Sequence, residues 1–390
     1  MKKKICIVTA TRAEYGLLRP IIRKLNDMEE FDIRVAVTGA HLSPEFGLTY
    51  REIEKDGIYI DKKIEMLLSA DTPTAISKSM GLALIGFAQY FSESKPDAAV
   101  LLGDRYETLA VACAAMNERI PIIHLYGGET TEGAVDEVIR HAITKMSYLH
   151  LTSTEVYRNR IIQMGEEPER VFCVGAMGVE NVLCSRVLKK DELKKRLSMD
   201  IDSPYALVTF HPVTLEENSA EFQIRELLAA LEQFPDWKFI ITKANADKDG
   251  RIINKILDEY SLKFENVKVF DSLGTACYLS AMKYSRMVIG NSSSGLIEAP
   301  SFHIPTVNIG DRQKGRIQAE SVIDCRPEKN EIIKAIRMAD EGRFRGKIKE
   351  TVNPYGDGRT SDKIAALFVE KLCCSEIHLK KKFYDIERCV

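Results

Sequence analysis

Met287-Val-Ile-Gly290-Asn-Ser-Ser-Ser-Gly-Leu-Ile-Glu298 joins an apolar strand to a short amphipathic segment through a glycine and three consecutive serines. The N–H groups that begin a helix have no partner within it and carry partial positive charge. We therefore expect a phosphate to bind at Ser292, Ser293 and Ser294. Glu298 lies about one helical turn further on, where its carboxylate could accept hydrogen bonds from both hydroxyls of a ribose. The alternative is an ordinary strand-to-helix turn whose serines only cap the helix.

Strands and helices alternate along the chain on both sides of this stretch. An apolar run over Lys3–Ala10 predicts a buried strand, and helical spacing of apolar residues follows over Glu14–Asn26. The alternation restarts with a strand at Tyr205–Phe210, after a polar stretch at residues 180–203 that we expect to join two domains. The pattern predicts an α/β fold with two doubly wound, Rossmann-like domains that face each other across a cleft.

The length supports two domains, because 390 residues exceed what one hydrophobic core usually holds. We place the N-terminal domain at residues 1–180 and the C-terminal domain at residues 181–358, followed by a last helix and a tail at residues 377–390. A hydrophobic content of 45% and a charged content of 29% are ordinary for a globular protein.

Composition also excludes several classes of protein. The formal net charge of −2 argues against nucleic-acid binding. The nine cysteines show no CxxC pair, and the seven histidines form neither HxH nor HExxH, so we expect reduced thiols and no dedicated metal site. No apolar run is long enough for a signal peptide or a membrane span, and we expect a cytoplasmic protein that does not bind membranes.

Polar side chains with a possible chemical role follow several predicted strands. In a doubly wound sheet this is the edge at which ligands bind. The residues are Arg12, Asp104, Arg105, Glu129, His211 and Asn245. Each alone has a structural alternative: Arg12 as a surface charge, Asp104 as a helix cap, and His211 as a turn residue beside Pro212. Their shared position favours a binding site.

Acidic residues come from two neighbouring loops of the N-terminal half. Two carboxylates in one cleft can differ in pKa and divide acid from base catalysis, which makes Asp104 and Glu129 candidates. Asp136 is a third candidate, although it could instead cap the helix that follows it. Glu132 and Glu137 are typical of solvated charges. From the residues alone we expect a nucleotide diphosphate as ligand and acid/base chemistry, without a specified reaction.

Ordered motifs run along nearly the whole chain. They are Thr11-Arg-Ala-Glu-Tyr15, Gly103-Asp-Arg-Tyr-Glu107, Gly127-Gly-Glu129, Arg140-His-Ala-Ile-Thr-Lys145, His211-Pro-Val-Thr214, Gly290-Asn-Ser-Ser-Ser-Gly295 and Gly310-Asp-Arg-Gln-Lys-Gly-Arg316. With these motifs the chain resembles the hydrolysing UDP-N-acetylglucosamine 2-epimerases of bacterial sialic acid biosynthesis. The resemblance implies a glycosyltransferase-B fold, in which a C-terminal helix at 359–376 packs back on the N-terminal domain and the C-terminal domain binds UDP.

The resemblance also implies roles for individual residues. Contacts to the nucleotide sugar are expected at Arg12, Arg105, His211, Asn245, Ser292, Ser293, Glu298 and Arg312. His211 and Arg312 would lie near the diphosphate, where they would stabilise the charge of the departing UDP, so His211 also counts as catalytic. Asp104, Glu129 and Asp136 fall on or beside the acidic positions of the family.

The reaction implied by the resemblance has two steps. Removal of the C2 proton and anti loss of UDP from C1 give 2-acetamidoglucal, and water then adds with the opposite configuration at C2 to give N-acetylmannosamine. No metal ion or nicotinamide cofactor is expected, and the family likeness implies a homo-oligomer. One position departs from the mammalian and non-hydrolysing relatives. They carry a glutamate two residues after the histidine of the fifth strand, where this chain has Tyr126. Glu129, Tyr126 itself, or Asp104 with Asp136 could take its role.

Three other functions compete with this prediction. The same reaction could act on a UDP- or GDP-linked 2,4-diacetamido-2,4,6-trideoxy hexose of legionaminic acid synthesis. A glycosyltransferase would use the same fold to transfer the sugar intact. A sugar-nucleotide-binding protein would hold the ligand without turnover.

Overall fold

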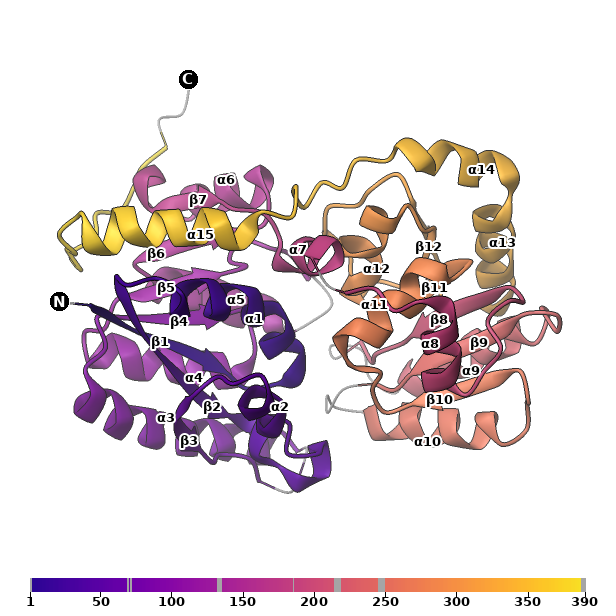
Figure 1. Cartoon of the computed structure of the whole chain (residues 1–390), viewed down its shortest axis with the longest axis horizontal. Coiled ribbons are helices and arrows are strands. Elements are labelled where there is room, and N and C mark those ends of the chain that lie inside the picture. The colour runs from indigo at the N-terminus through magenta and orange to yellow at the C-terminus, as the bar shows by residue number, and fades with distance from the viewer. Residues whose placement is uncertain are drawn as a thin grey trace. The chain divides into compact units, whose positions relative to one another are not determined.

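The computed structural model describes residues 2–68, 70, 72–131, 135–184, 186–213, 219–244 and 250–386. They form two compact units (Figure 1). The first unit comprises Met1–Glu129, Asp136–Asn181 and Tyr355–Val390, and the second comprises Thr130–Val135 and Val182–Pro354. Within the described ranges, no helix combines the length and the apolar character needed to cross a bilayer.

The first unit is built on a seven-stranded sheet in the order β3-β2-β1-β4-β5-β6-β7, and every pair of neighbours is parallel. The strands are β1 (Lys3–Thr9), β2 (Phe31–Thr38), β3 (Ile60–Ile64), β4 (Ala98–Leu102), β5 (Ile122–Leu125), β6 (Leu149–Thr152) and β7 (Val171–Cys173). Strands β1 and β4 lie at the centre and are buried on both faces, which explains their continuous apolar sequence.

Helices cover both faces of this first sheet. They are α1 (Arg12–Asn26), α2 (Tyr50–Lys55), α3 (Pro73–Ser94), α4 (Tyr106–Asn117), α5 (Asp136–Met146), α6 (Glu155–Gln163), α7 (Met177–Cys184) and α15 (Thr360–Phe368), which continues as a π-helical turn at Val369–Cys373. Short 3₁₀ segments are η1 (Gly39–Leu42), η2 (Pro44–Phe46) and η3 (Pro168–Arg170). Although α15 comes near the end of the chain, its residues Ile364 and Phe368 belong to the same apolar cluster as Ile5 and Leu18.

The second unit has a six-stranded parallel sheet in the order β10-β9-β8-β11-β12-β13. Its strands are β8 (Tyr205–Thr209), β9 (Lys238–Thr242), β10 (Val267–Phe270), β11 (Met287–Gly290), β12 (Thr306–Ile309) and β13 (Val322–Cys325). Its helices are α8 (Lys190–Leu197), α9 (Ser219–Leu231), α10 (Gly250–Ser261), α11 (Gly274–Tyr284), α12 (Ser293–Ile297), α13 (Lys329–Asp340) and α14 (Gly342–Lys347), with 3₁₀ segments η4 (Ala299–Phe302) and η5 (Ile348–Glu350).

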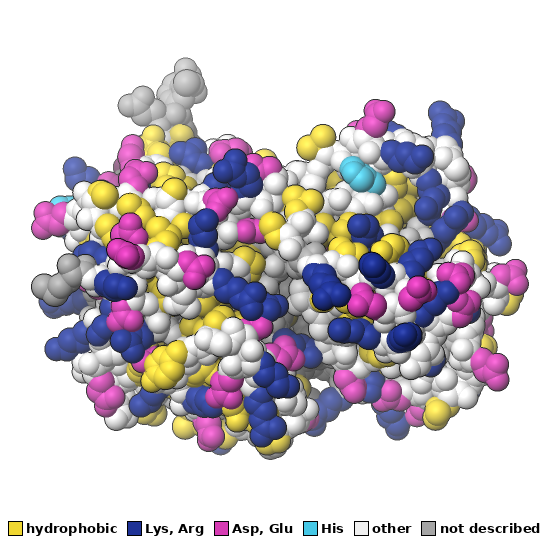
Figure 2. Space-filling model, in the orientation of Figure 1, with side chains coloured by type: hydrophobic (Ala, Val, Ile, Leu, Met, Phe, Trp, Pro, Cys, Tyr) yellow, Lys and Arg dark blue, Asp and Glu magenta, His cyan; other side chains and the backbone are white. Residues whose placement is uncertain are grey.

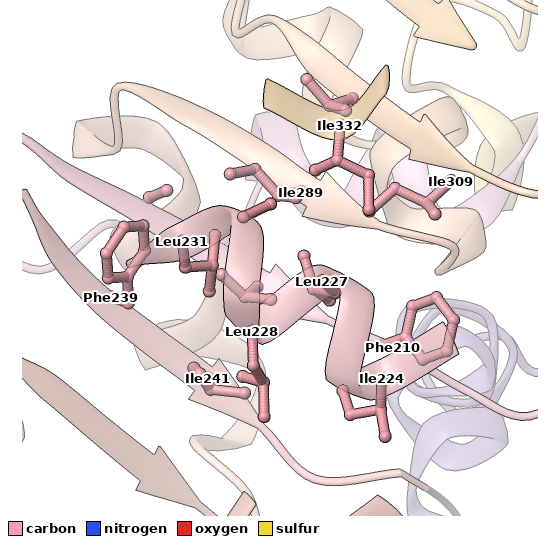
Figure 3. Packing of buried hydrophobic residues seen from close by; sticks show 14 of the residues in the cluster. Phe210, Ile224, Leu227, Leu228, Leu231, Phe239, Ile241, Ile289, Ile309 and Ile332 are labelled. Atoms are coloured by element: carbon pink, nitrogen blue, oxygen red, sulfur yellow. The ribbon is translucent and has the colours of Figure 1, made fainter. Parts of the chain in front are cut away.

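The apolar stripe of α9 packs against the second sheet. Figure 3 shows Ile224, Leu228 and Leu231 of α9 beside Phe239 and Ile241 of β9, and all five are buried. Residues at positions i, i+4 and i+7 lie on one side of a helix, which is why the sequence of α9 buries this set together. The cluster holds β8, β9 and β11 in register, and the carboxyl ends of β8 and β11 carry the candidate nucleotide residues.

The predicted α/β class with two doubly wound parallel sheets is confirmed. The polar stretch at 180–203, expected as a connection, proves to contain most of α7 and all of α8. Helix α8 is so polar that only its residues Leu193 and Leu197 are buried, and two apolar positions are too few to show a period. Basic and acidic side chains are mixed over the face shown in Figure 2, in keeping with 55 basic and 57 acidic residues in the chain.

Candidate functional site

Asp104 and Arg140 form an ion pair at the carboxyl end of β4. Asp104 follows the strand through Gly103, and the Asp104 side chain keeps 23% of its surface exposed. The guanidinium of Arg140, which is only 1% exposed, bonds through Nη2 to Asp104 Oδ2, through Nη1 to Glu137 Oε2 (2.7 Å), and through Nη1 to the carbonyl of Glu129 (2.7 Å). Although burial alone would lower it, these acidic neighbours raise the pKa of Arg140. A permanently charged arginine therefore fixes the position of Asp104.

Glu129 and Asp136 lie close to the same arginine in the structure. Glu129 is buried, and its Oε1 accepts a hydrogen bond from Ser153 Oγ (2.7 Å). Asp136 is the first residue of α5, four positions before Arg140, so both lie on one face of that helix. The structure thus brings Asp104, Glu129 and Asp136 around the single element α5. Asp104 is partly exposed, whereas Glu129 is buried.

His124 and Tyr126 form hydrogen bonds close to the carboxyl ends of β4 and β5. Burial lowers the pKa of His124 to about 4, so its imidazole is neutral, with Nε2 at 2.8 Å from the carbonyl of Gly103. A neutral ring that donates to this carbonyl fixes the turn before Asp104. Tyr126 has a positive φ of 67°, and its hydroxyl accepts a hydrogen bond from the N–H of Met177 (2.8 Å). The Tyr126 side chain is thus tied to the start of α7.

Arg12 and Arg105 also follow strands of the first sheet. Arg12 begins α1, and its guanidinium lies 3.9 Å from Glu52. Arg105 precedes α4 and donates from Nε to Glu107 Oε2 (3.2 Å). The predicted residues Arg12, Asp104 and Arg105 therefore share the carboxyl edge of β1 and β4, as expected from neighbouring parallel strands.

The second unit joins the carboxyl ends of β8 and β11 through Asn291. This fully buried side chain accepts from the N–H of His211 (2.7 Å) and donates to the carbonyl of His211 (2.8 Å). Gly290 just before it has φ 133°, and a Cβ there would lie 1.9 Å from the carbonyl oxygen of Thr209. Only glycine permits this approach. The chain is thus bent so that Ser292 and His211 emerge side by side.

The three serines have different partners. Ser292 caps α12, accepting from the N–H of Ser294 (3.4 Å), so the capping alternative describes part of its role. Ser294 Oγ lies 2.6 Å from the hydroxyl of Tyr278 and 3.1 Å from Ser292 Oγ. Ser293 begins α12, which has only five residues. Because so short a helix has a small dipole, hydroxyl and N–H donors rather than a macrodipole would hold an anion here.

Glu298 and Arg312 complete the described candidates in the second unit. Glu298 ends α12, and burial raises its pKa to about 8. The pKa of Tyr278 rises to about 12 through burial and the nearby charge of Glu298. Arg312 donates from Nη1 to the carbonyl of Asn291 (3.3 Å). Glu298 therefore follows the end of α12, and Arg312, further along the chain, contacts the residue just before the serine turn.

One predicted site residue lies outside the residues that the structure describes, and three residues of the site were not predicted from the sequence. Asn245 is not among the described residues. Arg140, Asn291 and Tyr278 were given no role, although Arg140 and Asn291 stand inside quoted motifs. A charged residue on the apolar side of a helix, at Arg140, was the available signal. Among the described residues, no three His, Cys, Asp or Glu side chains gather as a metal site requires.

The chain is similar to known proteins over almost its whole length. Residues 23–369 match the family described as UDP-N-acetylglucosamine 2-epimerase. A hydrolysing GDP/UDP-N,N'-diacetylbacillosamine 2-epimerase of Campylobacter jejuni is 46% identical, over 88% of this chain and 89% of that protein. Polysialic acid biosynthesis protein P7 of Escherichia coli is 41% identical, over 99% and 98%.

A solved structure shares the fold. The UDP-GlcNAc 2-epimerase of Neisseria meningitidis bound to UDP-GlcNAc superposes with a TM-score of 0.80, covering 94% of this chain and all of that one, at 18% identity. The glycosyltransferase-B fold implied by the sequence motifs is therefore confirmed. With a family match that covers most of the chain, the protein is an enzyme of the UDP-N-acetylglucosamine 2-epimerase family, as its motifs predicted.

Proposed function

We propose that this enzyme is a hydrolysing 2-epimerase that converts UDP-N-acetylglucosamine and water into N-acetylmannosamine and UDP, for sialic acid synthesis. The observation that carries the proposal is Asp104, a partly exposed carboxylate held by the buried Arg140 at the ligand-binding edge of a parallel sheet. Epimerisation by elimination needs a base for an unactivated C–H group, and a fixed carboxylate meets that need. The relative P7, named for polysialic acid biosynthesis, supports the pathway.

Asp104 would act as the base in the first step. It takes the C2 proton, the electron pair forms the C1–C2 double bond, and the C1–O bond breaks to release UDP. In the second step, water supplies the hydroxyl at C1 and a proton reaches C2 from the other face. Glu129 and Asp136 are the candidates for that proton transfer, and the buried position of Glu129 favours Asp136 or a bridging water as the direct donor. The C2 proton and the UDP that leave in the first step are thus replaced by a proton at C2 and a hydroxyl at C1.

Residues of the second unit would hold the UDP part. The hydroxyl and N–H groups of Ser292 and Ser293, with His211 and Arg312, supply donors for the diphosphate and stabilise the leaving group. Glu298 would accept from the ribose hydroxyls. Arg12, Arg105 and Asn245 are further proposed contacts to the nucleotide sugar. This set neutralises the charge of UDP by protein groups, so we propose no metal ion or cofactor.

A second candidate substrate is a UDP- or GDP-linked 2,4-diacetamido-2,4,6-trideoxy hexose. The Campylobacter jejuni relative at 46% identity favours it, because its name places it on such a sugar. The chemistry at C1 and C2 would be unchanged, so the sugar substituents at C4 and C6, and the nucleotide where it is GDP, distinguish the two candidates. We further propose a homo-oligomer in the cytoplasm.

Proton NMR on mixtures of the purified protein with each nucleotide sugar tests the proposal. Free N-acetylmannosamine and UDP, with deuterium incorporated at C2 in heavy water, are expected from UDP-N-acetylglucosamine. A higher kcat/KM on the diacetamido sugar would assign the second candidate. Transfer of an intact sugar to an acceptor would indicate a glycosyltransferase, and binding without release of UDP would indicate a binding protein.

The raised pKa of Glu298 predicts that the affinity for uridine depends on pH. Because burial raises its pKa to about 8, the carboxyl is mainly protonated at pH 7, whereas ribose hydroxyls donate best to a carboxylate. The affinity should therefore rise by up to about tenfold per pH unit from pH 6 to 8 and then level off. Calorimetry with uridine, which has no phosphate to titrate, measures this. In Glu298→Gln the profile should be flat, and in the exposed control Glu320→Gln it should match the parent; a flat parent profile would remove Glu298 from the ribose site.

The carboxyl group of Glu298 should also lower the stability of the folded protein at high pH. Its folded-state pKa is raised from 4.5 to about 8, so folding favours the protonated form and stability falls as pH rises through that interval. Glu298→Gln removes the cost of ionising a buried carboxyl. We expect its Tm at pH 8 to exceed that of the parent by about 2–4 °C, with a smaller difference at pH 5.

A further inference from the structure

A small enclosed cavity lies under the carboxyl ends of β1 and β4. Its volume of about 10 Å³ is close to what one water molecule requires. Strand residues such as Val8, Leu101 and Leu102 form apolar walls. Two carboxylates, Glu14 from α1 and Glu107 from α4, also line it. Neither has a role in the reaction described above, and buried carboxyl groups without a role are rare because their desolvation is costly.

Glu14 is held by one of its two oxygens. Its Oε2 accepts from the N–H groups of Ala10 (2.7 Å) and Thr11 (3.3 Å), whereas its Oε1 is buried and has no hydrogen-bond partner among the residues that the structure describes. Burial, followed by the charge of Glu107, raises the pKa of Glu14 to about 7. Near neutral pH a large share of Glu14 thus carries a proton, which its unpartnered oxygen is placed to hold.

Glu107 is almost completely buried and contacts Arg105 through both oxygens. Arg105 Nε lies 3.2 Å from Oε2, and Arg105 Nη2 lies 3.4 Å from Oε1. This two-point contact fixes the plane of the guanidinium. Arg105 itself is 23% exposed and adjoins Asp104, so it can meet a ligand from this fixed position.

We propose that the buried Glu107, with Glu14 beside it in the same cavity, holds Arg105 in place to bind the nucleotide sugar. This proposal rests on the proposed function, in which Arg105 is a binding residue. Glu107 is a positioning residue for Arg105, and Glu14 sets the charge of the pair. Two like charges in one apolar space oppose each other, which is why the nearby charge of Glu107 adds to burial in raising the pKa of Glu14.

Few other charged groups face the pair. On α1, Arg12 points to Glu52, 3.9 Å away. Beside β1, His41 of η1 is buried and neutral, with its pKa lowered to about 4 by burial. From α4 come only Arg105 and Glu107 among the described lining and its contacts. A second negative charge, formed as Glu14 ionises, would therefore bind Arg105 more strongly and oppose an anionic ligand. Once the opposite effect of Glu298 is removed by Glu298→Gln, affinity for the nucleotide sugar should fall as pH rises above about 7.

Substitutions of the pair test the proposal through KM, Kd and kcat. Glu107→Gln should raise KM and the calorimetric Kd for the nucleotide sugar about tenfold, because Arg105 loses its charged partner, while kcat changes less than threefold. Glu107→Asp keeps the charge and should recover part of the affinity. In Arg105→Gln, adding Glu107→Gln should have no further effect, because both act through one contact. Glu118→Gln, exposed at the end of α4, is the matched control.

The pH profile separates positioning from a merely structural role. In the Glu298→Gln background, the Kd for the nucleotide sugar should weaken above pH 7. Adding Glu14→Gln to that background should abolish this weakening and leave the Kd at pH 7 within about threefold. Unchanged KM in Glu107→Gln, additive effects with Arg105→Gln, or an unchanged profile in Glu14→Gln would each overturn the proposal. If the parent binds the nucleotide sugars but turns over neither, the proposed function is wrong. The positioning role of Glu107 is then tested by Kd alone. A parent that binds neither would overturn both.

Discussion

Asp104→Asn should lower kcat by at least about a thousand-fold and leave the affinity for UDP within about threefold of the parent. The amide cannot accept the C2 proton, although it keeps the shape of the side chain and can still contact Arg140. The residues proposed to bind UDP belong to the second unit, whereas Asp104 belongs to the first. Turnover is measured by UDP release from the nucleotide sugar, and affinity by titration with UDP.

Two controls make the result interpretable. Asp97→Asn alters a carboxylate at the opposite end of β4, where Asp97 accepts from the N–H of Lys4 (2.8 Å), and should keep the parent kcat. Solvent deuterium exchange at C2 should be lost in Asp104→Asn together with UDP release, since both follow removal of the same proton. Loss of turnover and of UDP binding together, with a lower Tm, would mean that Asp104 is structural. Retention of exchange would assign the base to Glu129 or Asp136.

The predictable part of the fold is the part with strong local patterns. Helical spacing predicts α5 at Asp136–Met146, the bounds that the structure has, because its buried face repeats every turn. Strand β3, with the sequence Ile-Asp-Lys-Lys-Ile, has only its ends apolar and lies at the sheet edge, so no buried run marks it. Strands β12 and β13 are short and include polar residues such as Asn308 and Asp324, so no continuous apolar run marks them. Their places depend on the neighbouring strands in the sheet.

The candidate site was predictable as far as topology determines it. Parallel strands end at one edge, which is why Asp104 and His211 could be singled out by position alone. What sequence could not show is pairing over long separations. Arg140 lies 36 positions after Asp104, and Asn291 lies 80 positions after the His211 backbone that it bonds. Such contacts depend on how helices pack on the sheet, and local pattern carries no information about them.

The C-terminal tail packs on the first unit, which its composition alone did not predict. Lys381 Nζ donates to Glu166 Oε2 (2.8 Å) and to the carbonyl of Ser147 (2.7 Å). The N–H of Tyr384 bonds to the carbonyl of Gly165 (2.9 Å). Glu166 also binds Lys145 of α5 (2.6 Å), so the tail, α5 and the loop before β7 meet at one buried carboxylate. Since α5 carries Asp136 and Arg140, the tail contributes to the stability of the sheet edge that holds the candidate catalytic residues.

Glu166→Gln should therefore lower the free energy of unfolding of the first unit by about 3 kcal/mol at pH 7. Burial alone would raise the pKa of Glu166, but hydrogen bonds from His150, Lys145 and Lys381 lower it from 4.5 to about 2. The stabilisation is thus fully present above pH 4.5 and is lost as pH falls towards 2. Urea unfolding of parent and variant at pH 7 and pH 3.5 should show a smaller difference at the lower pH. Glu376→Gln, on the exposed part of the tail, should match the parent at both. If the free energy of unfolding differs equally between parent and variant at both pH values, Glu166 acts by packing rather than by charge. A stabilisation that depends on charge would weaken as the carboxylate is protonated.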